Sequence, residues 1–477
     1  MSRKDPPGTT SRPTVLIVGA GLGGCVVAHA LADTHDVTVV ELGVLVSDMQ
    51  ARLKDIGVPA RLDPHVGAGP GGTTALWHNG LIEVSESVFD ECWPFPKSEM
   101  APWYEEAYRL LGGVERFLVE DAGAALRGKY REAGLAAAQM PTMFIPARRR
   151  NLWETLGLRD RVRFVRGEVT GLEVAGGNRV RQAVVATENG EQRLQADLFV
   201  LAAGGLGTPV LLQALADEVP LPALRLAGCF YEDHPMAFVG LVTLRVPLYR
   251  FWNYRVPRAR GSLRMPLVVH HDGLQVSFQL RPAVKEGQRE KVATMITQLR
   301  NNPLNLLNYF RVLRHPDDLL DILSYRFGIR LPTRHYSLLM VAEQPRTPER
   351  AVSSEVDPVS AQRWITRNWQ LSAAYLSTLR NAITGFIAGL GNIVISSRVF
   401  ANWDQSLDTA AHHSGTARMS ASASDGVCDR NARVHGMQNL FVADGSLLPG
   451  TGIANTGLTI AAAALRLGHH LNAGQED

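Results

Sequence analysis

The chain has 477 residues, of which 45% are hydrophobic, and its 49 basic residues nearly balance its 46 acidic ones. A chain of this length buries a large core and is expected to form two domains. The formal net charge of +3, with no basic stripe and no zinc-ligand spacing in the sequence, argues against a nucleic-acid-binding protein.

The first predicted element is an apolar strand that turns at Gly19, Gly21 and Gly24 into a helix, followed by a second strand over Val37–Glu41. The first glycine permits the tight turn, the second lets the backbone approach a pyrophosphate, and the third lets helix and strand pack closely. Glu41 ends the second strand about 20 residues later, where a carboxylate binds ribose hydroxyls. The pattern predicts a βαβ unit that binds a dinucleotide.

The same stretch has an alternative interpretation, since Val15–Ala32 carries no charged residue and follows Arg3, Lys4 and Arg12. A signal peptide or a membrane span has this appearance. The glycines would break a spanning helix, and we therefore expect a soluble protein with a flexible tail over residues 1–13.

The cysteines indicate in which compartment the protein is expected. The four of them are widely separated, and one lies inside the helix that follows the glycine turn, so a disulfide framework is not expected. A reducing cytoplasm fits them best. They are Cys25, Cys92, Cys229 and Cys428.

Further elements of a cofactor domain follow in chain order. The glycine-rich stretch Gly67–Gly80 is suited to pass close to a flat ligand. Lys97–Gly112 is predicted to be a helix with Ser98 as its N-cap. Val162–Thr187 alternates as a hairpin or small sheet does, and Ala196–Gly205 is a buried strand before a helix that starts at Thr208-Pro209.

From Gly228 to about Trp403 the pattern changes to antiparallel strands, such as Met236–Leu244 and Leu274–Leu280, and predicts a second domain for the substrate. Within it, Lys291–Leu331 is mainly helical in pattern, with arginines among leucines and tyrosines. Such a segment lies on a membrane or a partner, or packs on its own domain. We favour the packed surface helix.

Three blocks near the C-terminus, Ala411–Met419, Asn431–Pro449 and Gly452–Ala464, carry a resemblance to a known family. They resemble the glucose-methanol-choline (GMC) flavoprotein oxidoreductases, whose pattern is H-x-x-G-T-x-R-M, then V-x-G-x-x-N-L-x-V-x-D-x-S-x-x-P, then a loop with His or Asn before a long helix. The glycine fingerprint, Gly71-Gly-Thr and Asp233-His-Pro235 match in the expected order, as do Trp93-Pro94, Ala101–Gly112 and Ala342-Glu-Gln344. The resemblance extends from Val15 to His470.

In that family the cofactor is FAD, and an alcohol loses its hydroxyl proton while hydride passes to the flavin N5 atom. The resemblance assigns the catalytic histidine to His412 and its partner to Asn455. A neutral imidazole accepts a proton near neutral pH. His413 adjoins the base and is not expected to take part directly, while His234 and His435 are expected to be structural.

The resemblance also implies a set of cofactor-binding residues. Val169 would read the adenine through its backbone, and Asp444 would lie against the flavin ribityl or pyrophosphate through its backbone and the following helix. Leu76 falls where some members attach the flavin through a histidine, so we expect non-covalent FAD, with His78 as the alternative link. The set comprises Gly19, Gly21, Leu22, Gly24, Glu41, Gly72, Thr73, Asn79, Gly80, Val169, Ala203, Asp444, Gly445, Asn455 and Thr456.

The predicted fold is α/β, with a discontinuous Rossmann-like FAD-binding domain over residues 14–85, 156–227 and 404–472. A second α+β domain built on an antiparallel sheet, over residues 86–155 and 228–403, is predicted to bind the substrate. No metal site is expected.

The predicted function is oxidation of an alcohol to an aldehyde or ketone by a cytoplasmic enzyme that does not contact a membrane. A primary alcohol of a sugar, aminosugar or polyol in a biosynthetic step is favoured as substrate, with O2 or another electron acceptor. Two alternatives are a GMC-fold lyase of the hydroxynitrile lyase type, with FAD as a structural group, and a flavin-binding protein without turnover.

Overall fold

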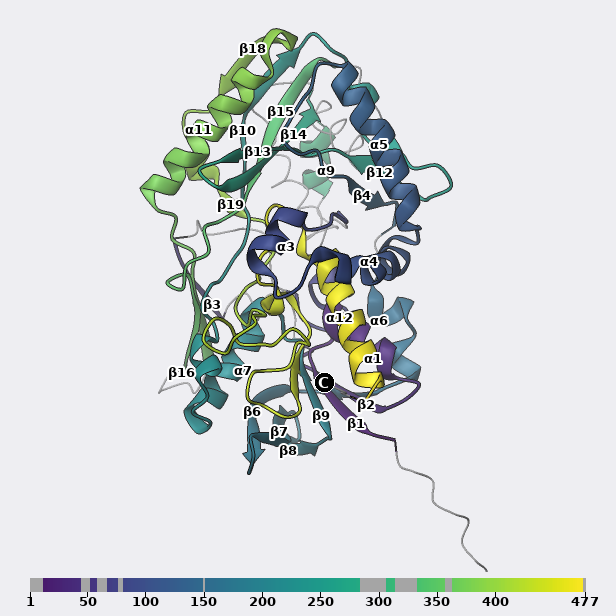
Figure 1. Ribbon diagram of the computed structural model, residues 1–477, viewed down its shortest axis with the longest axis vertical. Helices are drawn as coiled ribbons and strands as arrows, with labels where there is room; N and C mark the ends of the chain where they lie inside the picture. The colour runs from purple at the N-terminus through teal and green to yellow at the C-terminus, as the bar shows by residue number, and fades with distance from the viewer. Residues whose placement is uncertain are drawn as a thin grey trace, which may run out of the picture.

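The computed structural model describes residues 12–43, 52–57, 67–75, 80–148, 151–283, 306–313, 333–356 and 363–474. It is elongated, with one large sheet in each half of the molecule (Figure 1). The lower half in that view holds a parallel sheet and the two helices nearest the chain ends, and the upper half holds an antiparallel sheet.

The parallel sheet gathers strands from three distant parts of the chain, in the order β20-β9-β1-β2-β5. Its centre, β1 and β9, is almost fully buried, as expected for parallel strands covered on both faces. This discontinuous assembly confirms the Rossmann-like architecture. The strands are β1 (Thr14–Val18), β2 (Asp36–Glu41), β5 (Arg163–Arg166), β9 (Leu198–Leu201) and β20 (Leu440–Val442).

Two helices pack side by side in this half, α1 (Leu22–Leu31) and α12 (Thr456–Asn472). A Cβ atom added at Gly468 would lie 2.5 Å from Ala30 Cβ, and four residues further along the chain at each place the hydroxyl of Thr34, just beyond the end of α1, bonds Asn472, the last residue of α12. Because both contacts advance in the same direction, the helices are parallel. At a rise of about 1.5 Å per residue, α12 begins about 6 Å further along this axis than α1.

A small antiparallel sheet extends the same half. Its order β6-β7-β8 confirms the hairpin expected around residues 176–178, where Gly177 (φ 78°) and Asn178 (φ 56°) adopt the left-handed conformation of a tight hairpin turn. The first strand of the predicted Val162–Thr187 stretch instead joins the parallel sheet as β5. The three strands are β6 (Glu168–Ala175), β7 (Arg179–Thr187) and β8 (Gly190–Gln195).

The upper half is built on an antiparallel sheet of order β13-β14-β15-β10-β18, with β19 pairing the start of β10. This confirms both strands expected there. The ring of Phe278 stacks on Phe386 of α11 (Ala373–Gly389) with centroids 4.2 Å apart. The strands are β10 (Pro235–Leu244), β13 (Leu267–His271), β14 (Leu274–Pro282), β15 (His335–Ala342), β18 (Val394–Val399) and β19 (Asp408–Thr409).

Two further three-stranded sheets pair segments whose contact was not predicted from the sequence. One has the order β11-β12-β4, and the other the order β16-β17-β3, in which β3 pairs parallel to β17 and α7 packs on β16. The strands are β3 (Leu53–Ile56), β4 (Met143–Pro146), β11 (Tyr254–Arg255), β12 (Gly261–Arg264), β16 (Val352–Val356) and β17 (Arg363–Asn368).

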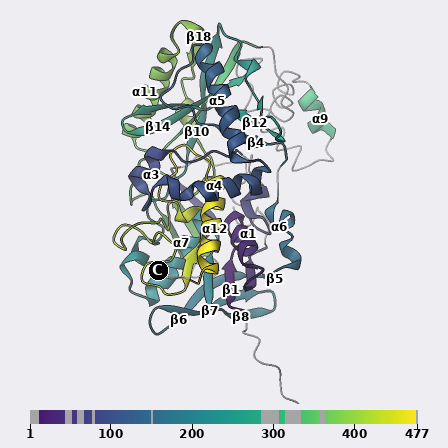
Figure 2. The same ribbon diagram turned by 45° about the vertical axis from the view of Figure 1, so that its right-hand side comes forward.

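The remaining helices cover the sheets or connect the two halves (Figures 1 and 2), and α9 stands out at the side of the molecule in the second view. Large parts of the predicted helical region over residues 291–331 lie outside the described residues. The helices are α3 (Glu86–Cys92), α4 (Ala101–Ala107), α5 (Arg116–Glu132), α6 (Leu152–Thr155), α7 (Gly204–Glu218) and α9 (Leu306–Leu313). Single 3-10 turns cover 72–75, 97–100, 158–160, 222–226, 248–250, 391–393, 403–406 and 445–447.

Two predicted helix starts were wrong. Helix α7 begins at Gly204 and not at Thr208, so Pro209 lies inside the helix, and the Gly205 carbonyl four residues before it accepts from the Thr416 hydroxyl at 2.8 Å. The predicted helix over 97–112 divides into a 3-10 turn, α4 and a π-type turn that ends at Gly113 in a left-handed cap. Ser98 lies within the 3-10 turn and caps nothing.

All four cysteines are free thiols. In the part of the chain that the structure describes, every helix is too short or too polar to cross a bilayer.

Candidate functional site

The glycine turn after β1 is packed so tightly that side chains are excluded from it. A Cβ atom at Gly19, whose φ is +103°, would lie 2.3 Å from the Ala202 carbonyl oxygen, and one at Gly24 would lie 2.0 Å from the Gly19 carbonyl oxygen. The closest approach is at Gly23, where a Cβ would lie 1.5 Å from the Ala443 carbonyl oxygen. The sequence motif did not single out Gly23, because its contact is with a strand more than 400 residues away in the chain.

The start of α1 presents backbone N–H groups that a helix cannot satisfy itself. Its N-cap, Gly21, makes no side-chain capping bond, and the first turn, which starts at Leu22, holds no acidic residue. Gly72 closes over this end, since a Cβ there would lie 2.9 Å from Gly21 Cα. The start of α1 and Gly72 therefore fit an anionic pyrophosphate group. We call them, together with Glu41, the dinucleotide cradle.

Glu41 is buried at the end of β2, and its carboxylate joins two loops. The N–H of Ala20 donates to Oε2 at 2.6 Å, and the N–H of Gly69 donates to Oε1 at 2.8 Å. Each carboxylate oxygen has a second lone pair left for a ribose hydroxyl. In the structure Glu41 thus holds the glycine-rich loop against the first turn, a role beyond the predicted ribose contact.

The Asp444 side chain is fully engaged inside the protein. Its Oδ2 accepts from the Gly204 N–H at 2.8 Å and from the Thr208 hydroxyl at 2.5 Å, and its Oδ1 accepts from the N–H and hydroxyl of Ser446. Burial raises the pKa of Asp444, and these bonds oppose that shift. The side chain is therefore occupied within the protein, and the predicted backbone contact of Asp444 with a cofactor stays a prediction. Gly445 lies beside it, where a Cβ would meet the His413 carbonyl oxygen at 2.5 Å.

The other predicted cofactor residues lie at several places around this cradle. Val169 is buried on β6, Ala203 is the N-cap of α7, Thr456 is the first residue of α12, and Thr73 is exposed in the turn after Gly72. Asn79, Leu76 and His78 lie outside the described residues.

Asn455 precedes α12 and caps it without a side-chain hydrogen bond. A Cβ atom at Gly80 would lie 2.9 Å from Asn455 Nδ2, so the structure brings these two predicted residues together. Because α12 begins about one turn beyond α1, Asn455 lies on the side of the cradle that faces the upper half of the molecule.

His412 follows β19 and lies beside the start of β10. Its Nδ1 is 2.9 Å from Nδ1 of His234, and its backbone N–H donates to Asp233 Oδ1 at 3.0 Å. Part of the residue is accessible, although protein surrounds most of the ring. Burial, and then the neighbouring His234 ring, lowers the pKa of His412 from 6.5 to about 3. The imidazole is therefore neutral at neutral pH.

The structure brings His412 close to the loop that carries Asn455. His234 Nε2 is 3.1 Å from the Thr451 hydroxyl, and the Ala454 N–H donates to the Thr451 carbonyl oxygen. The two predicted catalytic residues are thus linked through His234 and Thr451, which sequence reasoning did not assign to the site.

Asp233 collects donors from both sides of this cluster. Its Oδ2 accepts from the Thr409 hydroxyl and, at 3.2 Å, from the Tyr231 hydroxyl, and it lies 3.4 Å from His413 Nδ1. Burial opposes ionisation, but the hydrogen bond and charge of His413 hold the pKa of Asp233 well below its usual value. Asp233 was not assigned to the site from the sequence, although its place in the Asp233-His-Pro235 segment, which matches the family pattern, could have identified it.

Tyr231 extends the network toward the surface. The buried guanidinium of Arg367 donates to the Tyr231 hydroxyl at 3.3 Å and to Asp55 Oδ1 on β3 at 2.8 Å. The pairing of β3 with β17 thus places the carboxylate of Asp55 against a buried arginine.

A second charged cluster lies behind the loop at Gly450. Arg346 donates to Glu343 at 2.9 Å and to Glu91 at 2.5 Å, while its Nε is 4.0 Å from Glu232 Oε1. Burial raises the pKa of Glu232 to about 8, although Arg346 opposes the shift. Glu232 is thus a neutral acid at neutral pH.

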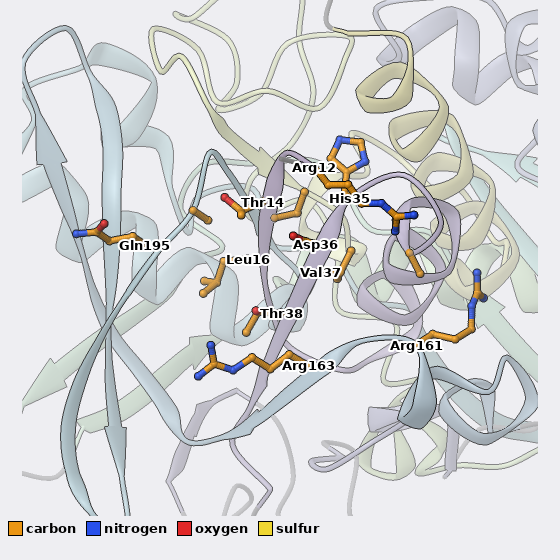
Figure 3. Close-up of a pocket in the computed structure, with 13 residues that line it drawn as sticks. Arg12, Thr14, Leu16, His35, Asp36, Val37, Thr38, Arg161, Arg163 and Gln195 are labelled. Carbon is orange, nitrogen blue, oxygen red and sulfur yellow. The ribbon is translucent and has the colours of Figure 1, made fainter. Parts of the chain in front are cut away.

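A surface pocket of about 440 Å³ lies elsewhere, at the other end of the parallel sheet (Figure 3). Thr14 and Asp36, the first residues of β1 and β2, line it together with Arg12, Arg161 and Arg163. Ligands of open parallel sheets bind at the carboxyl ends of the strands. The pocket is therefore distinct from the cradle and from His412.

Comparisons with known proteins agree with this fold. Residues 392–464 match the family described as GMC oxidoreductase. No curated protein matches the sequence.

Solved structures similar to the chain include pyridoxine 4-oxidase from Mesorbium loti, with 17% identity, coverage of 98% of this chain and 100% of that one, and a TM-score of 0.62. A formate oxidase of Aspergillus oryzae RIB40 has 16% identity, coverage of 97% and 98%, and a TM-score of 0.60. An FAD-dependent oxidoreductase from Chaetomium thermophilum has 16% identity, coverage of 97% and 100%, and a TM-score of 0.58.

A dinucleotide cradle on a parallel sheet, next to a neutral and partly accessible histidine beside an antiparallel sheet, fits an FAD-dependent oxidoreductase. The matched residues 392–464 include much of the C-terminal blocks that resembled the glucose-methanol-choline (GMC) oxidoreductases in the sequence, and over these residues the family match confirms that resemblance.

Proposed function

We propose that this chain oxidises the primary alcohol of a sugar, aminosugar or polyol, with His412 as the base that accepts the hydroxyl proton. The observation that carries the proposal is the neutral, protein-surrounded imidazole of His412, held at Nδ1 by His234. No described residue bonds its Nε2, which is therefore the nitrogen available to a substrate hydroxyl. A base in this position contributes about 10²- to 10⁴-fold to the rate.

FAD, when bound, supplies the hydride acceptor. The residues proposed to hold it are those of the cradle: the α1 start binds the pyrophosphate, Glu41 the ribose, and the backbone at Asp444 and Gly445 the part nearer the ring. Asn455, at the start of α12, is proposed to hydrogen-bond the substrate oxygen beside His412. The N-terminal end of α12 also favours negative charge on that oxygen.

The polar side chains around the histidines support a hydroxyl-rich substrate. Gln344 accepts the Asp233 N–H at 3.0 Å, and its buried Nε2 makes no hydrogen bond within the described residues. Gln275 lies behind Gly452, where a Cβ would be 2.9 Å from its Oε1. A polyol offers an acceptor to the Gln344 amide group and a donor to the Gln275 oxygen, whereas a sterol leaves them unsatisfied.

We also propose that the flavin is held without a covalent link and is reoxidised by O2 or by another acceptor. The four free thiols support a reducing, cytoplasmic compartment and a biosynthetic role there.

One anaerobic experiment tests the function. The purified, FAD-loaded protein is mixed with sugars, aminosugars, polyols and aliphatic and aromatic alcohols, and with a cyanohydrin. An oxidoreductase bleaches the flavin band at about 450 nm with one alcohol class. Cleavage of the cyanohydrin without bleaching would instead assign the lyase reaction, and bleaching only with aromatic alcohols would overturn the substrate class.

A further inference from the structure

His234 and His412 meet in an unusual way, through the same ring atom of each. The two Nδ1 atoms are 2.9 Å apart, and the ring planes stand at 78° with centroids 5.0 Å apart. A hydrogen bond between two such nitrogens requires that one carries a proton and the other a lone pair. The contact therefore couples the tautomers of the two rings.

Both rings carry a single proton at neutral pH. Burial lowers the pKa of His234 to about 4 and that of His412 to about 3. Two arrangements then remain. Either His412 donates from Nδ1 and its Nε2 is bare, or His234 donates from Nδ1 and the His412 proton is on Nε2.

The contacts of the other ring nitrogen of His234, Nε2, distinguish these two arrangements. Its Nε2 faces the Thr451 hydroxyl at 3.1 Å, and a hydrogen bond with the backbone of the next residue, Gly452, raises the pKa of the ring. That direction is the effect of a carbonyl oxygen, which only accepts a proton. An acceptor at Gly452, beside the Thr451 hydroxyl that faces Nε2, favours the His234 tautomer with its proton on Nε2, in which Nδ1 has the lone pair and His412 donates to it.

The backbone of both residues is fixed by one carboxylate. Asp233 Oδ1 accepts the His234 N–H at 2.6 Å and the His412 N–H at 3.0 Å. The other charged or titratable groups at this cluster are His413, Tyr231 and Arg367, which face Asp233 Oδ2 or Tyr231. The shared carboxylate thus fixes the backbone positions of the two histidines relative to each other.

We propose that His234 is a positioning residue that holds His412 in the tautomer with a bare Nε2, and that Thr451 and the Gly452 backbone fix His234 in turn. This inference rests on the proposed role of His412 as the base. In the opposite tautomer Nε2 would carry a proton and would not accept one from an alcohol.

The test compares three variants of the FAD-loaded protein by stopped-flow flavin reduction. His234→Leu removes the acceptor and is expected to slow reduction by about 10²- to 10³-fold, since a histidine left in the wrong tautomer is a poor base. His234→Asn keeps an amide oxygen near the Nδ1 position and is expected to recover at least about tenfold of that loss. Thr451→Val keeps the His234 ring and is expected to cause a smaller loss. His271→Leu, at the partly exposed end of β13, is the matched control.

A second readout reports the tautomer directly. In protein labelled with ¹⁵N-histidine, the His412 signals, assigned by their loss in His412→Asn, are expected to show a protonated Nδ1 and a bare Nε2, with or without FAD. The His234→Leu variant is expected to shift this population. A parental His412 spectrum together with a parental reduction rate in His234→Leu would overturn the inference.

The two claims fail separately. If His412→Ala reduces flavin at the parental rate, the proposed base is wrong. If His412→Ala is slow but His234→Leu is fast with an unchanged spectrum, only the positioning role is wrong. Should His234→Leu not fold, His234→Asn and Thr451→Val decide the question by the same spectrum, and a protonated Nε2 in the parent protein contradicts the proposal without any variant.

Discussion

His412 and Asp233 are 179 positions apart in the chain, yet the backbone N–H of the first donates a 3.0 Å hydrogen bond to the carboxylate of the second. The same carboxylate oxygen binds the His234 N–H. A single buried anion therefore sets the position of both histidines at the proposed reaction centre.

Asp233→Asn is expected to destabilise the protein, because the amide nitrogen cannot accept from the donors that now meet the carboxylate. Breaking a buried, charge-assisted contact of this kind costs about 2–5 kcal/mol. Thermal unfolding followed by fluorescence measures the change. Asp36→Asn, at an exposed strand end, is the control and is expected to unfold as the parent does. A parental unfolding temperature for Asp233→Asn would contradict the role given to this anion.

His412→Ala is expected to keep FAD and to lose most of the rate of flavin reduction, by about 10²- to 10⁴-fold. The cradle residues do not depend on the ring, since they contact other parts of the chain. Flavin content by absorbance and reduction by stopped flow measure the two effects. Loss of FAD from this variant would mean that His412 supports the cofactor site and is not only a base.

Glu41→Ala is expected to weaken FAD binding by about 10- to 100-fold, which is about 1.4–2.8 kcal/mol, and to leave the reduction chemistry intact when FAD is supplied. The variant loses the proposed ribose contact and also releases the Gly69 N–H from the carboxylate. Titration of the apoprotein with FAD gives the affinity. The exposed Glu191→Ala serves as the control, and parental FAD affinity in Glu41→Ala would remove Glu41 from the cofactor site.

The two coupled histidines are expected to make stability fall in acid. Their pKa values in the folded protein, about 3 for His412 and about 4 for His234, lie below the ordinary value of 6.5. The unfolded chain therefore binds more protons between these values, so the stabilisation is complete above pH 6.5 and is lost as the pH falls toward 4 and 3. The double variant His234→Asn/His412→Asn should show a flatter dependence of unfolding temperature over this range. An equal slope in both proteins would contradict the neutral buried pair.

Glu232 is expected to have the opposite effect on the pH dependence of stability, because it destabilises the folded protein as the pH rises. Its folded pKa of about 8 lies above the ordinary 4.5, so the folded state binds more protons and loses stability as the pH rises from 4.5 to 8. Glu232→Gln removes this loss, and its advantage in unfolding temperature over the parent should grow from pH 5 to pH 8. Glu188→Gln, which is exposed, should show no such trend, and a pH-independent difference for Glu232→Gln would contradict the buried neutral acid.

Local patterns along the chain predicted much of this protein. The glycine turn, the strand that ends at Glu41, the hairpin at residues 176–178 and the strands β9, β10 and β14 were each predicted within a few residues. They follow from steric limits and hydrophobic periods that act over a few neighbours. The start of α7 was misplaced because Gly204 and Asp444 satisfy its first turn across the sheet.

Contacts between segments far apart in the chain could not be predicted from the sequence. The C-terminal blocks identified His412 and Asn455 as candidates, because the motif is contiguous. Only the tertiary structure placed His234 Nδ1 against His412, joined both to Asp233, and set Gly23 against Ala443. Hydrogen-bond partners and burial, and with them the pKa of each histidine, depend on which parts of the chain the fold brings together, and no spacing along the sequence encodes that choice.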